Sequence, residues 1–217
     1  MLSIDGLVAG YPAGFALPPL SLQLQPGSIT RLAGANGAGK STLLQTIAGR
    51  QTPLSGRVLL GGEPADHTGP AWKRQVAALL GDDAWLTGLT AGEHLTLLAR
   101  AHDVTSPEAA ITEICAALNL PIRFLDAYPE ALSSGQRRKV LLASALFRSA
   151  EVLLLDEPEQ NFDAASVQAL RRLLIARAES GTAILLSTHD DALIDPERTT
   201  TVQICEHPDG TLGYDAA

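Results

Sequence analysis

Cysteine is scarce in this chain of 217 residues, which contains only Cys115 and Cys205. The two lie far apart and lack the paired spacing of a metal site or a disulfide framework, so we expect both to be reduced residues of the core. The first residues do not combine a basic segment with an apolar one, and no apolar run reaches the roughly 18 residues that a membrane span needs. We therefore expect a cytoplasmic protein, which reaches a membrane only where a partner holds it there.

Positive charge is also in deficit, because 16 Lys and Arg residues stand against 24 Asp and Glu residues, for a net charge of −8 and a pI near 5.0. This balance provides no general attraction for nucleic acid or for an anionic bilayer. The remainder is typical of a packed globular protein, with 46% hydrophobic and 18% charged residues and no internal repeat. The length predicts a single domain, residues 1–217, with room for a small subdomain.

Apolar periodicity and turn residues together predict an α/β fold. In the first part of the chain, segments 2–8, 20–24 and 29–33 have the patterns of strands, and the last runs into a glycine-rich turn and a helix at 41–48. Later helices alternate with buried strands whose continuous apolar runs favour a parallel sheet covered on both faces. In chain order these elements are a helix at 134–148, a strand at 152–155, a helix at 164–179, a strand at 183–187 and a closing hairpin from strands at 200–205 and 212–214.

Between these two parts the sequence predicts a helical insert over residues 86 to 130. Thr90 and Glu93 have the spacing of a capping box ahead of an apolar helical pattern. Ser106 and Pro107 similarly predict a cap and a first-turn proline before a second helix.

The glycine-rich turn carries a phosphate-binding motif, because Gly34 to Ser41 match G-x-x-x-x-G-K-[ST] in full between a strand and a helix. Its glycines allow successive N–H groups to face phosphate oxygens, and the helix N-terminus adds partial positive charge. Lys40 would bridge the β- and γ-phosphates, and the hydroxyl of Ser41 would ligate Mg²⁺. The alternative is a glycine-rich turn without a ligand. We assign nucleotide binding to Gly34, Asn36, Gly37, Ala38, Gly39, Lys40, Ser41 and Thr42.

Two carboxylates follow the buried strand at 152–155. Asp156 can hold Mg²⁺ directly or through water, and Glu157 can accept a proton from the attacking water or orient it. The alternative is that both acids cap the turn before Pro158. Beside the phosphate motif, a nucleotide-hydrolysing site is the better interpretation.

The segment Leu132 to Gln136, LSSGQ, resembles the LSGGQ signature of ATP-binding-cassette ATPases, with a serine in place of the first glycine. Further resemblances follow in the family's order: Asn161-Phe162-Asp163 is similar to the D-loop, and Ser187 to Asp190 is similar to the switch-histidine segment. The resemblance as a whole runs from about residue 2 to residue 205. The resemblance implies a P-loop NTPase with a RecA-like core, an antiparallel β subdomain and a helical signature subdomain at about residues 86–150.

The same resemblance implies roles for individual residues. His189 would hydrogen-bond the γ-phosphate and position Glu157 with its water. Tyr11 lies where the family places an aromatic ring that stacks on adenine, and Phe15 is a competing candidate. In the family two subunits pair head to tail. Each ATP then contacts the phosphate-binding turn of one subunit, called the cradle below (Gly34 to Ser41 in this chain), and the signature of the other subunit. Ser133 and Gly135 are implied to act across this interface, and Gln136 and Asp163 are further residues implied in nucleotide binding.

One position departs from the family's pattern. A glutamine that touches Mg²⁺ and senses the membrane partner is expected between the core and the helical insert, but Leu79 to Trp85 contain none. Gly81, Asp82 or Asp83 takes its place, depending on the alignment. Asp82 is our candidate metal ligand there, because a carboxylate can supply an oxygen to the metal.

The resemblance implies the ATPase subunit of a membrane transporter, working with a second nucleotide-binding subunit and a membrane-spanning subunit at the inner face of the membrane. The transporter subunit would dock near residues 81 to 90, where Trp85 and Leu86 are candidate contacts. The compact chain favours an exporter-like or small multisubunit system. Two alternatives remain: a soluble cassette ATPase that acts as an assembly or repair factor, and a regulatory ATP-binding half of a heterodimer.

Overall fold

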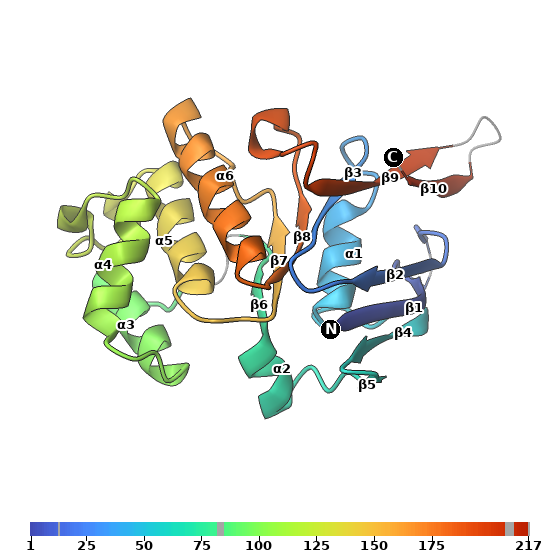
Figure 1. Ribbon diagram of the computed structural model, residues 1–217, viewed down its shortest axis with the longest axis horizontal. Coiled ribbons are helices and arrows are strands. Elements are labelled where there is room, and N and C mark those ends of the chain that lie inside the picture. The colour runs from blue at the N-terminus through green and yellow to red at the C-terminus, as the bar shows by residue number, and fades with distance from the viewer. Residues whose placement is uncertain (13, 82–84, 207–210, 217) are drawn as a thin grey trace.

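The computed structural model describes residues 1–12, 14–81, 85–206 and 211–216, whose strands form two sheets (Figure 1). The antiparallel four-stranded sheet has the order β2-β1-β4-β5. The six-stranded sheet has the order β10-β9-β3-β8-β7-β6 and is parallel except for the β9-β10 pair. The strands are β1 (Leu2–Val8), β2 (Leu20–Leu24), β3 (Ile29–Ala33), β4 (Ser55–Leu60), β5 (Glu63–Pro64), β6 (Val76–Leu79), β7 (Val152–Asp156), β8 (Ala183–Ser187), β9 (Thr199–Glu206) and β10 (Leu212–Ala216).

The central strands of the six-stranded sheet are buried on both faces. Along β7, Val152 and Leu154 belong to one apolar cluster, whereas Leu153 and Leu155 belong to the other. Because successive strand residues point to opposite faces, each face of β7 must be covered by other elements. The predicted parallel sheet is therefore confirmed, together with the reason for its continuous apolar runs.

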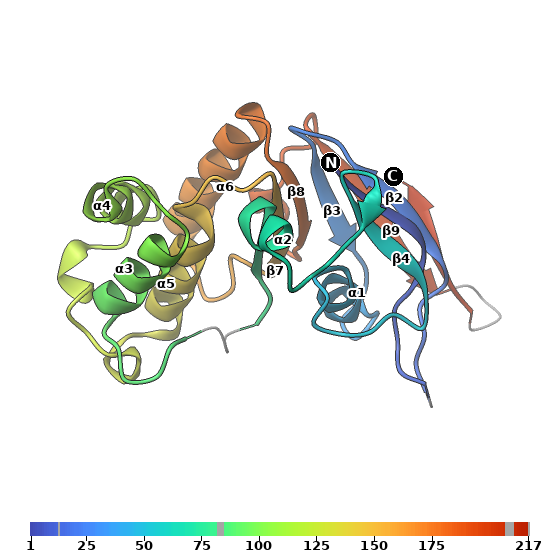
Figure 2. The ribbon, with the colours of Figure 1, turned by 90° about the horizontal axis from the view of Figure 1, so that it is seen from below.

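Helices cover the two faces of this sheet unequally (Figures 1 and 2). One face packs against α1 and the antiparallel sheet, and the other packs against α3, α4, α5 and α6. The α-helices are α1 (Lys40–Ile47), α2 (Pro70–Gln75), α3 (Ala91–Ala101), α4 (Pro107–Ala117), α5 (Ser134–Leu146) and α6 (Ala164–Glu179). Short 3₁₀ turns are η1 (Ile122–Phe124), η2 (Pro129–Ala131) and η3 (Asp191–Leu193). Consequently α1 and α5 lie on opposite faces of the six-stranded sheet.

Most of the expected elements are present with ends shifted by a residue or two. The capping box of Thr90 and Glu93 is confirmed at the start of α3. Ser106 lies at the N-cap of α4 and Pro107 begins the helix, as predicted, but Ser106 has a φ of 55° and its side chain makes no capping hydrogen bond. The segment 207–210 of the expected hairpin lies outside the described residues, whereas its two strands pair as expected.

The two cysteines differ in burial. Cys115 lies in the core with no exposed surface. Cys205 is half-buried in β9, so its expected place in the core is wrong. The reason is that β9 is covered less completely than β3 beside it, and its burial alternates along its length.

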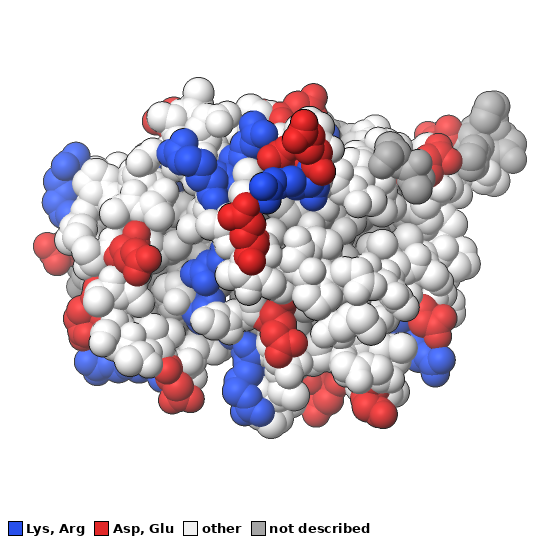
Figure 3. All heavy atoms as spheres, in the orientation of Figure 1, with Lys and Arg blue, Asp and Glu red and all other residues white. Residues whose placement is uncertain are grey.

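Charged residues of both signs are interspersed over the face drawn in Figure 3. Several form ion pairs, such as Arg198 with Glu179 at 2.7 Å between their nitrogen and oxygen atoms. Within the described ranges, no helix is both long enough and apolar enough to cross a membrane.

Candidate nucleotide site

The glycine-rich turn lies between β3 and α1, at the carboxyl edge of the parallel strands. Gly39 has a φ of 99°, and a Cβ there would lie 2.6 Å from the ring of Phe15, so only glycine fits. Lys40 is 6% exposed, and its Nζ donates hydrogen bonds to the carbonyl oxygens of Gly34 at 2.9 Å and Ala35 at 3.0 Å. The turn thus holds a nearly buried ammonium group against its own backbone.

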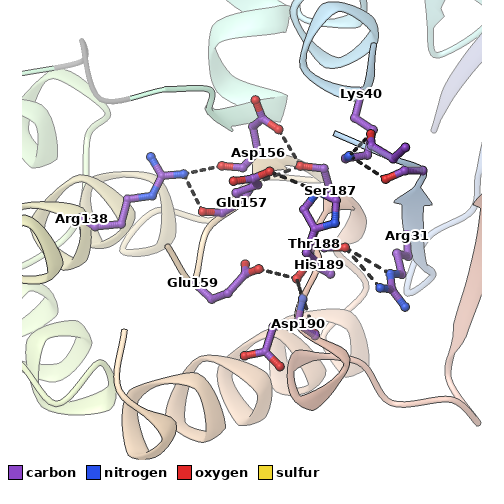
Figure 4. A network of polar contacts seen from close by, with 12 residues as sticks. Arg31, Lys40, Arg138, Asp156, Glu157, Glu159, Ser187, Thr188, His189 and Asp190 are labelled. Atoms are coloured by element: carbon purple, nitrogen blue, oxygen red, sulfur yellow. Dashed lines mark hydrogen bonds and ion pairs between the residues drawn. The ribbon is translucent and has the colours of Figure 1, made fainter. Parts of the chain in front are cut away.

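The electrostatics of Lys40 link the turn to the two acids after β7. Burial lowers the pKa of Lys40, and the nearby carboxylates of Glu157 and Asp156 act in the opposite direction. Ser41 is exposed in the first turn of α1, and Thr42 beside it is half-buried. The structure therefore brings the cradle and the acids together, as the sequence predicted (Figure 4).

Asp156 and Glu157 are held by the neighbouring strand β8. The Oγ of Ser187 donates a hydrogen bond to Oδ1 of Asp156 at 2.5 Å. The backbone N–H of Glu157 donates to Oγ of Ser187 at 3.0 Å and to its carbonyl oxygen at 3.2 Å. Glu157 has a φ of 44°, a left-handed conformation that a non-glycine residue keeps only where its surroundings impose it. Ser187, which the sequence analysis placed only within the switch segment, therefore fixes both acids.

His189 is the side chain that approaches the Glu157 carboxylate. Its Nε2 lies 3.6 Å from Oε1 of Glu157, and the two side chains are 45% and 39% exposed. Both groups thus face solvent at the edge of the sheet. The predicted pairing of the switch histidine with this glutamate is consistent with their positions.

A network of polar contacts around the buried Thr188 adjoins the histidine (Figure 4). The hydroxyl of Thr188, which is 1% exposed, donates to Oε1 of Glu159 and accepts from the N–H of Asp190 at 3.0 Å. The carbonyl oxygen of Thr188 accepts from Arg31, whose Nη1 also pairs with Asp191 at 2.8 Å. Burial raises the pKa of Glu159, although its hydrogen bond with Thr188 opposes the shift. The segment around His189 is consequently anchored from both sides.

The signature residues lie at the start of α5. Ser133 and Gln136 form a reciprocal capping box, in which Ser133 Oγ accepts from Gln136 N–H at 3.2 Å and Gln136 Oε1 accepts from Ser133 N–H at 2.9 Å. Asp163 caps α6 by accepting from the N–H of Ser166 at 2.7 Å, and hydrogen bonds with the Ser166 side chain and with this N–H lower the pKa of Asp163. A Cβ at Gly135 would lie 2.5 Å from the carbonyl oxygen of Asn161, so the signature and the D-loop are in close contact.

The cradle and the signature line two separate cavities of the structure. A cavity of about 340 Å³ beside the turn is lined by Phe15, residues 35–38, residues 204–206 and Leu212. Another of about 210 Å³ contains Ser133, Gly135, Gln136 and Asp163. The linings have no residue in common. The structure therefore does not bring the predicted signature residues to the cradle of the same chain.

The two aromatic candidates for the nucleobase differ in position. Phe15 is half-buried and lines the cavity beside the turn. Tyr11 is 54% exposed and is not among the residues that line this cavity. The expected order of preference is thus not supported by the geometry, since Phe15 is the aromatic ring against the turn.

The candidate ligand Asp82 lies outside the described residues, as does Asp83. Sequence reasoning also missed Arg138, a buried residue of α5 that contacts the carbonyl oxygen of Gly81 and those of both acids. Its place in a basic run, Arg137-Arg138-Lys139, gave no signal of burial, because such runs usually face solvent.

Comparison with known proteins places the chain in a family. A family model described as ABC transporter matches residues 17–160. The chain therefore belongs to the ABC transporter family, as an ATP-binding cassette ATPase. It is 37% identical over 197 residues to the cobalt import ATP-binding protein CbiO of Rhodobacter capsulatus, covering 88% of this chain and 70% of that protein.

A second curated relative is the Fe(3+) ions import ATP-binding protein FbpC of Mesorhizobium japonicum, 33% identical over 196 residues. The match covers 88% of this chain and 54% of that protein, so the chain spans about half of its length.

Solved structures agree with this fold. The ATP-binding subunit of an ABC transporter has a TM-score of 0.86 at 26% identity, over 100% of this chain and 90% of that chain. An ATP-binding cassette solved as a dimer after hydrolysis, with ADP and Pi, has a TM-score of 0.85 at 21% identity, over 100% of this chain and 98% of that chain. The second similarity shows the fold alone. The P-loop NTPase fold with mixed α/β sheets is thereby confirmed.

Proposed function

We propose that this chain is the ATPase subunit of an importer, which acts at the inner face of the membrane and drives uptake through a separate membrane-spanning subunit. The import direction is supported by CbiO and FbpC, both of which are named as import proteins. These relatives do not favour the exporter-like system that the compact chain suggested. The observation that carries the ATPase function is the meeting of Lys40, Asp156, Glu157 and His189 at one edge of the sheet.

The residues at this edge fit ATP together with Mg²⁺. Lys40 supplies a positive charge to the β- and γ-phosphates, and the N–H groups at the start of α1 face the same anion. Ser41 and Asp156 offer the oxygen ligands that Mg²⁺ prefers. In the described part of the chain no three His, Cys, Asp or Glu residues cluster to hold a metal by themselves, which fits an ion shared with nucleotide and water oxygens. Bound Mg²⁺ would neutralise charge on the phosphates.

Glu157 is the proposed proton acceptor for the attacking water. Its carboxylate is 39% exposed, so water can reach it, and its backbone is fixed by Ser187. His189 orients this carboxylate and donates toward the γ-phosphate when its Nε2 carries the proton. The proton leaves the water for Glu157 while Lys40 holds the phosphates in place.

Hydrolysis requires a second cassette in this proposal. Because the cradle and the signature of one chain line separate cavities, Ser133, Gly135, Gln136 and Asp163 complement the cradle of a partner. The partner is a second copy of the chain or a related cassette. ATP binding would close the pair, and hydrolysis would reopen it.

The first test is Glu157→Gln, with Glu151→Gln as the matched control at the opposite end of β7. Loss of the proton acceptor should lower ATP turnover by roughly a hundredfold or more while ATP still binds. The control, whose exposed side chain lies away from both motifs, should keep its turnover. Unchanged turnover in Glu157→Gln would refute the role of this residue.

The pairing of one subunit's cradle with the other subunit's signature is tested by mixing Lys40→Ala and Ser133→Arg subunits. Each variant should be inactive alone. A mixed dimer then retains one site with an intact cradle and an intact signature, so activity should reappear on mixing. If each signature served its own cradle, mixing would restore nothing.

The transporter partner is tested by purifying the tagged chain from detergent-solubilised membranes of its own host. A stoichiometric protein with several membrane spans is the expected companion. Recovery with soluble partners alone would instead favour an assembly or repair factor.

A further inference from the structure

Arg138 connects three parts of the site through one buried side chain. It lies in the second turn of α5 and is 3% exposed. Its Nη1 donates to the carbonyl oxygen of Gly81 at 3.0 Å, and its Nη2 donates to the carbonyl oxygen of Glu157 at 2.8 Å and to that of Asp156. The guanidinium therefore links the signature helix to the strand end that bears both acids (Figure 4).

The carbonyl side of Glu157 is where support is needed. This residue has a φ of 44°, and Ser187 holds only its N–H side. On the other side its carbonyl oxygen accepts from Arg138 and from the N–H of Gln160 at 3.1 Å. The carboxylate itself is approached by His189 at 3.6 Å. The location of the Glu157 carboxylate therefore depends on the orientation of the Glu157 backbone, which Arg138 helps to fix.

The shape of arginine matters at this position. Its planar guanidinium presents several N–H donors in a fixed fork, whereas lysine presents a single compact ammonium group. At Arg138 the fork reaches carbonyl oxygens of two chain segments, the end of β7 and Gly81 just after β6. A lysine keeps the charge but cannot reproduce both arms.

We propose that Arg138 is a positioning residue for ATP hydrolysis: it holds the backbone of Glu157 from the signature helix, so that the catalytic carboxylate and the start of α5 keep one arrangement. This rests on the proposed role of Glu157 as proton acceptor. Nucleotide binding depends on the turn around Lys40, which Arg138 does not contact through any of the carbonyl bonds described above.

The test compares Arg138→Lys with the wild type in two backgrounds, natural Glu157 and Glu157→Gln, by single-turnover hydrolysis of γ-labelled ATP. Arg137→Lys is the matched control, since Arg137 is exposed on the same helix. With Glu157 present, Arg138→Lys should lower the hydrolysis rate by roughly tenfold to a hundredfold, as expected for a misplaced catalytic group, with an unchanged dissociation constant for ATP. In the Glu157→Gln background the same change should alter the residual rate by less than about twofold.

Equal losses in both backgrounds would overturn the proposal, because Arg138 would then act independently of Glu157. A wild-type rate in Arg138→Lys would overturn it as well. Full turnover in Glu157→Gln alone would overturn the proposed role of Glu157 as proton acceptor, on which this proposal rests, and that result distinguishes the two failures. Where thermal melting shows that Arg138→Lys does not fold, Arg138→Gln, which keeps two donors, is carried through the same four-variant comparison.

Discussion

Gly135 and Gly92 form a matched pair of helix glycines. Each is the second residue of its helix, and both helices begin with a capping box. A Cβ at Gly135 would lie 2.5 Å from the carbonyl oxygen of Asn161, and a Cβ at Gly92 would lie 3.1 Å from that of Leu125. Ordinary contacts of this kind begin at 3.4 Å. The change to alanine therefore produces a severe overlap at Gly135 and a slight one at Gly92.

The expected magnitude follows from two opposing effects. Alanine favours either helix by about 0.5–1 kcal/mol over glycine. Overpacking costs roughly 1–3 kcal/mol, and this cost falls mainly on Gly135→Ala. Asn161 cannot easily retreat, because the neighbouring N–H groups of Gln160 and Phe162 bond to Glu157 and Glu159 at 3.1 and 2.9 Å. At about 2–4 °C per kcal/mol for a protein of this size, Gly135→Ala should melt about 2–12 °C below Gly92→Ala.

The assay is thermal unfolding of both variants and the wild type, followed by circular dichroism without nucleotide. Since both variants gain the same helix propensity, the difference between them isolates the contact with Asn161. A melting temperature of Gly135→Ala equal to or above that of Gly92→Ala would refute the close approach of signature and D-loop.

Three further predictions concern other groups. Burial raises the pKa of Glu159 above its ordinary value of 4.5, so its ionisation opposes folding as the pH rises through that value. Glu159→Gln should therefore melt above the wild type near neutral pH, and the gap should close as the pH falls toward 4.5. Phe15→Ala should weaken binding of a fluorescent ATP analogue more than Tyr11→Ala does, because only the former ring lines the cavity beside the turn; equal effects would contradict this. Cys115 has no exposed surface, whereas Cys205 is half-buried, so in native protein a thiol reagent should modify Cys205 alone, and both should react in denaturant.

The fold could be predicted from the sequence wherever local chemistry determines the chain's path. The cradle motif places Lys40 after a strand because its glycines are needed at that turn. The strand before Asp156 is apolar because other elements cover both of its faces. The two-residue strand β5 and the strand β6, which follows α2 directly, have patterns too short to be distinguished from a helix end.

Contacts between distant segments could not be predicted in this way. Arg138 has the sequence environment of a surface residue, and its partners in the described part of the chain include backbone carbonyl groups, which carry no sequence signal. The choice between Tyr11 and Phe15 likewise depends on how the segment after β1 folds back, which places Phe15 against Gly39.

At Glu157 the chain fixes the backbone but leaves the carboxylate accessible to solvent. Its backbone is held by Ser187 of β8, Arg138 of α5 and Gln160 of the following loop. Its carboxylate is approached by His189 at 3.6 Å, and both side chains are exposed. Since the opposing signature residues lie in a different cavity, this chain supplies half of each proposed site. Hydrolysis should therefore depend on the concentration of paired cassettes, whereas ATP binding to the cradle should not. A turnover per subunit that stays constant on dilution below the dimer's dissociation constant would contradict this division.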